Sequence, residues 1–412
     1  MKTQSAPLLN VNLRWFMLAI VLANIASEMV FSMMSLYLID LGASVGQVGL
    51  VFTVASFVPI VLQIIGGWLS DTIGRLRAIA IGSSVAVFGY LIFFVSPSWE
   101  WVLLGLSIEY VSGSFVGPSF LSYIAEQSDE AARGRVYGIS RGIYMVVAVI
   151  GPSLAGLLAY RVNFRFTMMV AFILYALATI VRVWMALSER FNPVRNSEKP
   201  TWSGLKSQMK AMLGLLTAGG IVTWIWISDA IGDTSFNLTA DLFPIYLSDI
   251  GHLTIEQIGL FASAWGIASI LGSLLGGWLT DKCSERTVIT GGFLLTTLGL
   301  VAMVLARSPL AFLGSRLLSG LGVGILMPPY DSLISKVVPE DKRGLAFGFF
   351  GTSLGILSLP MPWLGARLWE HFMPQTPFWI TAAACAITIP IAWIKFGLPK
   401  TDKPATAAPS PG

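Results

Sequence analysis

The chain has 412 residues, of which 55% are hydrophobic and only 12% are charged. Soluble globular domains carry about a quarter charged residues, so this composition excludes an ordinary water-soluble fold. The formal net charge is +4, and the way it is distributed, described below, does not indicate a nucleic-acid surface.

Apolar runs of about 20 residues recur along nearly the whole chain, and each is long enough to cross a hydrocarbon core of about 30 Å as a helix. The predicted spans are residues 15–38, 46–69, 78–95, 101–125, 136–159, 166–187, 217–245, 255–279, 288–306, 310–335, 345–366 and 377–397. These twelve spans predict an all-α membrane protein. The N-terminus has no short apolar segment with a small-residue cleavage site, so we expect no removed signal peptide.

Lysine and arginine residues concentrate on one side of the predicted membrane. Loops on the side of the N-terminus hold 19 of the 26, whereas the other side holds only Arg161, Arg165, Arg307 and Arg367. Positively charged loops stay in the cytoplasm. Both termini are therefore expected to be cytoplasmic, in a multi-pass protein of the plasma (cell inner) membrane.

The first span carries Asn24 and Glu28, four residues apart and so on one face of a helix. Glu28 lies roughly 20 Å from the cytoplasmic end, near the membrane middle. An ionised carboxylate there costs at least about 2.5 kcal/mol, so it is expected to face a cavity, find a partner or bind a proton. The alternative is a carboxyl group that only ties helices together.

A polar hairpin follows the second span and returns after the eighth. Residues 66–77 read GGWLSDTIGRLR, and residues 276–286 read GGWLTDKCSER. The repeat indicates a duplicated chain. Each hairpin resembles the loop 2-3 signature of the major facilitator superfamily, Gly-x-x-x-Asp-(Arg/Lys)-x-Gly-Arg-(Arg/Lys), or its echo in loop 8-9.

The resemblance implies a gate at the cytoplasmic face. The family's hairpin acid, here Asp71, rests against the start of the eleventh span, near Gly344. Arg75 would pair with an acid at the end of the fourth span, for which Glu126 is well placed. Thr72 replaces the usual basic residue. An ordinary basic cytoplasmic turn is the alternative reading.

The second hairpin carries the same roles in a more divergent form. Asp281 corresponds to the hairpin acid, Ser284 replaces the turn glycine, and Arg286 lies one residue beyond the arginine position. The resemblance therefore implies a gating role for Asp281 first and for Arg286 second.

The fourth and tenth spans resemble a family pattern in which a membrane arginine precedes a proline by twelve residues. Arg316 and Pro328 keep that spacing in the tenth span. The same spacing before Pro118 falls on Leu106, so the arginine is missing from the fourth span. Because the family ties that arginine to proton handling, Glu109, one turn later, is a candidate for a different titrating group.

The fifth span contains Gly151, Pro152 and Gly156, and it resembles the Gly-x-x-x-Gly-Pro-x-x-Gly-Gly motif of exporters in this superfamily. Val147 and Ala155 replace two of its glycines. Glycine and proline in a span permit a bend and close helix approach. The motif favours export, and helix packing alone is the alternative.

Three arginines fall within predicted spans. Arg141 is expected either to be a partner of Glu109 or to extend its side chain to the cytoplasm, and Arg182 is expected to reach the membrane surface in that way. Arg316 is expected to be paired inside the bundle, with partners available in residues 229–241.

The seventh span carries Asp229, Asp233, Asn237 and Asp241, which recur every fourth residue and drift about 40° per step around a helix. Such a row predicts a water-filled translocation path. The alternative is that Asp229 and Asp241 only lie near the two ends of the span.

Similar sequences end the first and seventh spans, and they place the two in register. In that register Asn24 falls on Asp233 and Glu28 on Asn237. The two halves therefore present a carboxylate and an amide at matching places, in exchanged order. Asp331, which follows two prolines in the tenth span, is expected at a bend facing the same cavity.

Other kinds of chemistry have little support in the sequence. Cys283 and Cys385 cannot meet across the membrane, and His252 and His371 lack metal-ligand spacing. No Gly-x-x-x-x-Gly-Lys-(Ser/Thr) motif occurs, so ATP-driven pumping is not expected. The 14 tryptophans are expected to anchor helices at interfaces rather than to line a cavity. We expect no enzyme, metal or cofactor.

Four segments are predicted along the chain. They are an N-terminal six-helix half at 1–190, a cytoplasmic linker with an amphipathic helix at 191–215, a C-terminal six-helix half at 216–400 and a disordered tail at 401–412. The resemblance implies that the halves are related by an axis along the membrane normal and that a substrate binds between them near the middle of the bilayer.

The sequence therefore predicts a monomeric secondary transporter that works by alternating access. We expect proton-coupled export of a small organic or cationic compound, with Glu28 and Asp233 as the coupling pair. An importer or facilitator of a sugar or other metabolite is one alternative, favoured by Leu106. A membrane receptor that keeps the fold without transport is the other.

Overall fold

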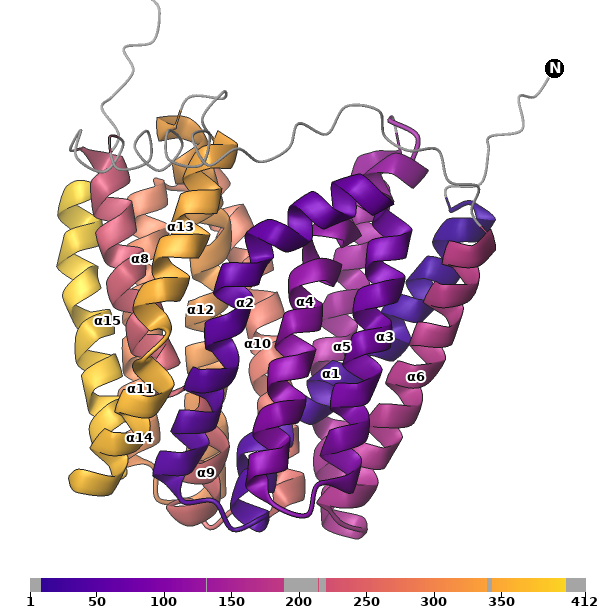
Figure 1. Ribbon diagram of the computed structural model, residues 1–412. Coiled ribbons are helices and arrows are strands. Elements are labelled where there is room, and N and C mark those ends of the chain that lie inside the picture. The colour runs from indigo at the N-terminus through magenta and orange to yellow at the C-terminus, as the bar shows by residue number, and fades with distance from the viewer. Residues whose placement is uncertain (1–8, 131, 189–213, 215–219, 339–342, 398–412) are drawn as a thin grey trace, which may run out of the picture.

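The computed structural model describes residues 9–130, 132–188, 214, 220–338 and 343–397 (Figure 1). The predicted tail at 401–412 and nearly all of the predicted linker, including its amphipathic helix, lie outside these ranges. Within them the chain forms helices and connecting turns, with no strand.

The first group of helices makes up what we term the N-terminal half. Its members are α1 (Val11–Asp40), α2 (Val45–Ile73), α3 (Arg75–Val95), α4 (Trp99–Gln127), α5 (Arg133–Arg161) and α6 (Phe164–Ser188). The second group makes up the C-terminal half. Its members are α8 (Ile221–Asn237), the 3₁₀ turn η1 (Ala240–Leu242), α9 (Phe243–Asp249), α10 (Ile255–Lys282), α11 (Glu285–Leu305), α12 (Pro309–Val337), α13 (Arg343–Ser358), α14 (Met361–His371) and α15 (Thr376–Lys395).

Within the described ranges each predicted span falls on one or two helices, which confirms the all-α class. Eight helices in the described ranges are long and apolar enough to cross a membrane by length and composition. Helix α1 begins, and α15 ends, at the end of the bundle that is uppermost in Figure 1. We call this the terminal end and the other the opposite end.

Two predicted spans are broken. Pro244 lacks a backbone N–H and lies at the start of α9, so the seventh span runs through η1 between α8 and α9. Pro360 and Pro362 similarly separate α13 from α14 in the eleventh span. The prediction that four polar residues share one helix is therefore wrong for the last of them, because Asp241 lies in η1 and not on α8.

Helices α5 and α10 join the two halves by close backbone contact. A Cβ added to Gly156 would lie only 2.9 Å from the Cα of Gly259. Nearby, the Ser153 hydroxyl donates to Ser263 Oγ at 2.6 Å, and the Ser263 hydroxyl donates to the Val149 carbonyl at 2.5 Å. Only small residues such as glycine and serine allow the two backbones to come this close, as is usual for helices that pack in membranes.

Helices α2 and α14 join the halves through backbone donors. The N–H of Gly46 donates to Glu370 Oε1 at 2.7 Å, and the N–H of Trp363 donates to Thr53 Oγ1 at 3.1 Å. Because α2 begins and α14 ends at the opposite end, these contacts close the halves together there. Figure 1 shows the halves diverging toward the terminal end, where α2 leans away from α13.

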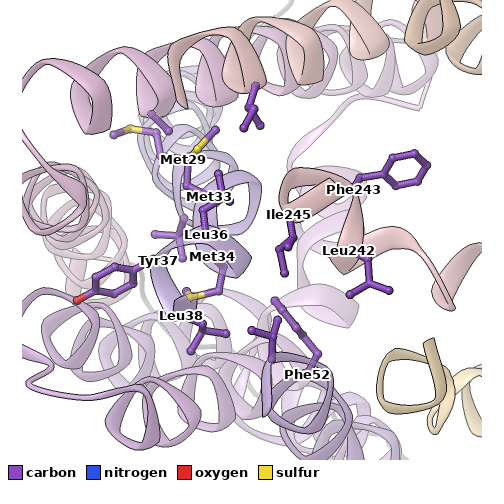
Figure 2. Packing of buried hydrophobic residues seen from close by; sticks show 14 of the residues in the cluster. Met29, Met33, Met34, Leu36, Tyr37, Leu38, Phe52, Leu242, Phe243 and Ile245 are labelled. Carbon is purple, nitrogen blue, oxygen red and sulfur yellow. The ribbon is translucent and has the colours of Figure 1, made fainter. Parts of the chain in front are cut away.

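An apolar cluster seals the opposite end between the halves. Figure 2 shows Met33 and Met34 of α1 and Phe52 of α2 grouped with Leu242 of η1 and Ile245 of α9. All are buried in one cluster. Their packing excludes water from this end, so the interior is reached from the terminal end.

The α5–α10 contact predicts a position-specific effect of side-chain size. Gly156→Leu forces the helices apart, and overpacking of this kind typically costs 1 to 3 kcal/mol, so we expect a lower Tm in detergent. Gly138→Leu on the same helix is the matched control, because no atom lies within 4 Å of a Cβ placed there. An equal loss of Tm in both variants would contradict the proposed contact.

Candidate functional site

Two cavities share Ser56 of α2 in their lining: one lies between α2 and helices of the C-terminal half, and the other is lined by helices α1, α2 and α4 of the N-terminal half. The first, which we call the Asp233 cavity, has a volume of about 420 Å³. Its lining residues are Ser56, Asp233, Asn237, Gly351, Leu354, Gly355, Ser358, Leu359 and Pro362. The second, the Glu109 cavity, also measures about 420 Å³. Its lining residues are Phe31, Ser56, Pro59, Glu109, Tyr110, Gly113 and Ser114.

The Asp233 cavity places a carboxylate next to the break between α13 and α14. The Ser358 hydroxyl, on the last residue of α13, donates to Asp233 Oδ2 at 2.6 Å. Asp233 is nevertheless exposed to the cavity, and Asn237 lines the wall one turn further along α8. Asp229, one turn before, is half-buried near the Tyr330 hydroxyl of α12. The cavity therefore offers one exposed carboxylate with a hydroxyl donor.

The Glu109 cavity combines a carboxylate with an aromatic pair. The rings of Phe31 and Tyr110 stack with centroids 5.8 Å apart and an interplanar angle of 18°. Within the described residues, Glu109 makes no ion pair. Aromatic faces attract cations, so this wall suits a positively charged group with an apolar body.

Glu28 and Asn24 lie behind these cavities and line neither of them. Glu28 packs against Gly151 of α5, where an added Cβ would overlap the Glu28 side chain. The Asn24 amide nitrogen is buried without a hydrogen-bond partner in the described part of the chain. Glu28 is thus half-buried in a helix contact outside the linings of these two cavities, and its role in proton coupling stays a prediction.

The residues of the exporter-like motif form the contact between halves. Pro152 is buried, and its carbonyl lies 2.5 Å from a Cβ placed on Gly259. Gly151 accommodates Glu28 and Gly156 accommodates α10, as described above. In this structure the motif Gly151, Pro152 and Gly156 therefore provides close packing on two sides of α5.

The arginines within the spans differ from expectation. Arg182 does not reach the membrane surface: it is 3% exposed and donates to the Ser83 hydroxyl at 2.7 Å. Arg316 makes no ion pair with a described carboxylate. Its guanidinium instead lies 4.5 Å from the ring centroid of Phe243 and 5.5 Å from that of Trp265. A cation held by ring faces in a low-dielectric interior replaces the predicted charge pair.

Arg141 of the N-terminal half and Asp331 of the C-terminal half carry opposite charges and interact electrostatically. Both are exposed, Arg141 on α5 and Asp331 on α12, and they lie close enough to interact. Since α5 begins and α12 ends at the terminal end, both lie on the side on which the halves diverge. Arg141 has no described contact with Glu109.

The hairpin residues lie at the terminal end. Arg75 Nε and Glu126 Oε1 are 3.3 Å apart. Asp281 is exposed in the last turn of α10, and the Arg286 guanidinium lies 4.8 Å from the ring centroid of Trp393. The side chain of Asp71 lies outside the described part of the chain, so its expected contact near Gly344 stays a prediction.

The C-terminal half contains an ion pair that sequence analysis missed. Glu285 is buried and bonds to Lys336, and it also accepts from the Ser332 hydroxyl at 3.1 Å. In the duplicated chain Glu285 corresponds to Arg75 and Lys336 to Glu126, so the pair is conserved in place but reversed in charge. The pair was missed because the second hairpin was searched for an arginine. Comparing opposite charges at the two positions 210 residues after Arg75 and Glu126 would have found it.

The comparisons agree with this architecture. The family model of the Major Facilitator Superfamily matches residues 16–251 and 225–411, which together cover nearly the whole chain. The chain belongs to the major facilitator superfamily. It is therefore a multi-pass membrane transporter and not an enzyme.

Proteins similar to this chain include multidrug efflux pumps. A protein of Lactococcus lactis described as "Multi-drug resistance efflux pump PmrA homolog" is 28% identical over 81% of this chain and 82% of its own length. "Multidrug resistance protein MdtG" of Dickeya zeae is 24% identical over 90% of each chain. The "Quinolone resistance protein NorA" of Staphylococcus aureus is 22% identical over 83% of this chain and 86% of its own length.

Solved superfamily structures share the fold. The peptide transporter POT in complex with sulfate matches with a TM-score of 0.72 at 12% identity, covering 93% of each chain. The D-xylose-proton symporter matches with a TM-score of 0.70 at 14% identity, covering 93% of this chain and 97% of the other. This confirms the fold predicted from the hairpins.

The reversed pair predicts unequal effects of two similar substitutions. Glu285→Gln leaves Lys336 without its buried partner, and loss of a charged hydrogen bond typically costs about 1.5 to 3 kcal/mol. Glu126→Gln removes the half-exposed counterpart, for which about 0 to 1 kcal/mol is typical. Thermal unfolding in detergent should show the larger fall in Tm for Glu285→Gln. The combined swap Glu285→Lys with Lys336→Glu should recover part of that fall; no recovery would exclude a charge pair.

Proposed function

We propose that this superfamily member exports small organic cations in exchange for protons. The observation that carries the proposal is the lining of the two cavities, in which Asp233 and Glu109 are the only ionisable acids or bases among the described residues, apart from the Tyr110 phenol. The resemblance to multidrug efflux pumps supports the same direction of transport.

The proposed cycle starts from the conformation described here. Lysines and arginines gather in the loops of the terminal end, so we assign that end to the cytoplasm and the closed opposite end to the outside. A cation enters from the cytoplasm and displaces protons from the cavity carboxylates. The halves then rock so that the cavity opens outward, where protons compete the cation off. Bound charge can shift this equilibrium only if the two conformations bind it with different affinity.

Cation binding and proton release should be coupled at the cavity carboxylates. We expect tetraphenylphosphonium to release protons from detergent-purified protein in weakly buffered solution. Asp233→Asn and Glu109→Gln should each weaken cation binding by tenfold or more, because a charged contact of about 1.4 kcal/mol corresponds to a factor of ten. Asp249→Asn, an exposed acid outside both cavities, is the matched control.

Three results would redirect the proposal. Unchanged release in both cavity variants would move the site elsewhere, and Glu28→Gln would then be tested next as the originally predicted coupling residue. Binding of a neutral sugar without proton release would favour the importer or facilitator. No binding and no flux in vesicles would favour a non-transporting receptor.

The contact of Glu370 with the start of α2 is proposed to stabilise the inward-facing state. A carboxylate at a helix N-terminus is typically worth 0.3 to 1 kcal/mol, and more when partly buried. Glu370→Gln should therefore raise the outward-open population about two- to fivefold.

Cysteine labelling from outside measures that population. Both native cysteines are first replaced, and Leu359→Cys then places a thiol in the Asp233 cavity. Glu370→Gln should speed its reaction with an impermeant maleimide. Glu256→Gln, an acid in the first turn of α10 at the same end, is the control. Equal rates in all three backgrounds would show that Glu370 does not hold this end closed.

A further inference from the structure

A buried polar cluster in the N-terminal half lies behind the Glu109 cavity. Arg182 of α6 and Ser83 of α3 are linked by the hydrogen bond described above, and both are fully enclosed. The Arg182 Nε has no hydrogen-bond partner among the described residues. A buried cation without a carboxylate in contact is costly, so its presence calls for an electrostatic explanation.

Two tyrosines extend the cluster toward the cavity. Tyr90 lies seven residues after Ser83 on α3, and Tyr175 lies seven residues before Arg182 on α6, which is two helical turns in each case. The two helices are antiparallel, so Tyr90 lies opposite Tyr175 just as Ser83 lies opposite Arg182. The rings stack with centroids 4.2 Å apart and an interplanar angle of 16°. The Arg182 guanidinium lies 6.0 Å from the Tyr175 ring centroid.

The stacked pair lies next to Glu109. Helices α3 and α4 approach closely at Gly89, where an added Cβ would lie 2.8 Å from the Gly105 carbonyl and 3.5 Å from the Glu109 Cβ. Glu109 and Arg182 each interact electrostatically with Tyr90 and with Tyr175. The Tyr90 and Ser27 hydroxyls are 2.8 Å apart, which ties the pair to α1. The two rings therefore separate a cavity carboxylate from a buried guanidinium.

We propose that Arg182 is the fixed counter-charge of Glu109, held in place and linked to it by the stacked Tyr90–Tyr175 pair. The inference rests on the proposed function, in which Glu109 exchanges protons for a cation. Arg182 touches no substrate and acts as a positioning residue. It stabilises the ionised carboxylate between proton release and cation binding, so its removal should make Glu109 hold a proton up to higher pH.

Other groups line the Glu109 cavity or interact with Tyr90, Tyr110 and Tyr175 next to it. Within the described residues they are Tyr90 from α3, Tyr175 and Arg182 from α6, Tyr110 from α4 itself, Phe31 and Ser27 from α1, Ser56 and Pro59 from α2, and Asp241 from η1. Asp241 interacts with Tyr110 and carries the opposite sign to Arg182. Arg182 is the only cation in this set.

The test measures tetraphenylphosphonium binding as a function of pH. A unit charge that acts across a pair of stacked rings, at an effective dielectric constant of about 20, shifts a titration by on the order of one pH unit. Arg182→Gln should therefore move the midpoint about one unit higher, and Arg182→Lys should restore most of the wild-type value. Tyr175→Phe, which keeps the ring and removes the hydroxyl, should shift it in the same direction by less.

A second background separates this role from packing. In Glu109→Gln, the further change Arg182→Gln should leave whatever pH dependence remains unmoved. A shift of equal size in both backgrounds, or a lower Tm with no shift, would overturn the inference. If Arg182→Gln does not fold, Tyr175→Phe decides in the same way. If tetraphenylphosphonium binding to the wild type does not depend on pH, the proposed function is rejected instead.

Discussion

The close contact of α5 with α10 determines how the rest of the molecule is arranged. Because Gly156 and Gly259 bring two backbones together, the halves meet at one end and separate toward the other. The Glu370 contact and the methionine-rich cluster add to the same closure. In a bilayer the hydrophobic effect does not drive helices together, so packing of this kind carries the association. The position of the Asp233 cavity follows from it, since that cavity occupies space that the tilted halves leave open between α2 and the C-terminal half.

Charge is distributed unevenly around those cavities. The carboxylates Asp233 and Glu109 line them, whereas two arginines lie outside their linings: Arg182 is buried near the Tyr175 ring, and the half-buried Arg316 lies against Phe243 and Trp265. Arg182 can be compared with Leu106, which is fully buried at the position where the superfamily pattern has an arginine. Helix α6 supplies a cation to the interior of this half where α4 supplies a leucine.

Sequence analysis predicted the fold well because the signals for it are local and repeated. Apolar runs locate the spans, and the hairpins at 66–77 and 276–286 identify the superfamily. The site was less predictable, because the depth of a residue along a helix does not determine which neighbour it faces. Arg182 is near the end of its span yet points inward, and Glu28 is deep yet lies against Gly151. The pair Glu285–Lys336 was missed because it keeps the position and reverses the charges.

The two cavity carboxylates belong to different halves, Glu109 to the N-terminal half and Asp233 to the C-terminal half. A cation between them attracts both, and this attraction favours an arrangement in which the halves approach each other at the terminal end. Protonation of either carboxylate removes that attraction. Arg141 and Asp331, exposed on facing helices at the same end, are placed to gain a closer contact as the halves approach. In the proposed cycle, substrate charge and the conformational equilibrium are therefore linked through carboxylates that the fold holds apart, and the closure at the opposite end is the contact that must yield when they come together.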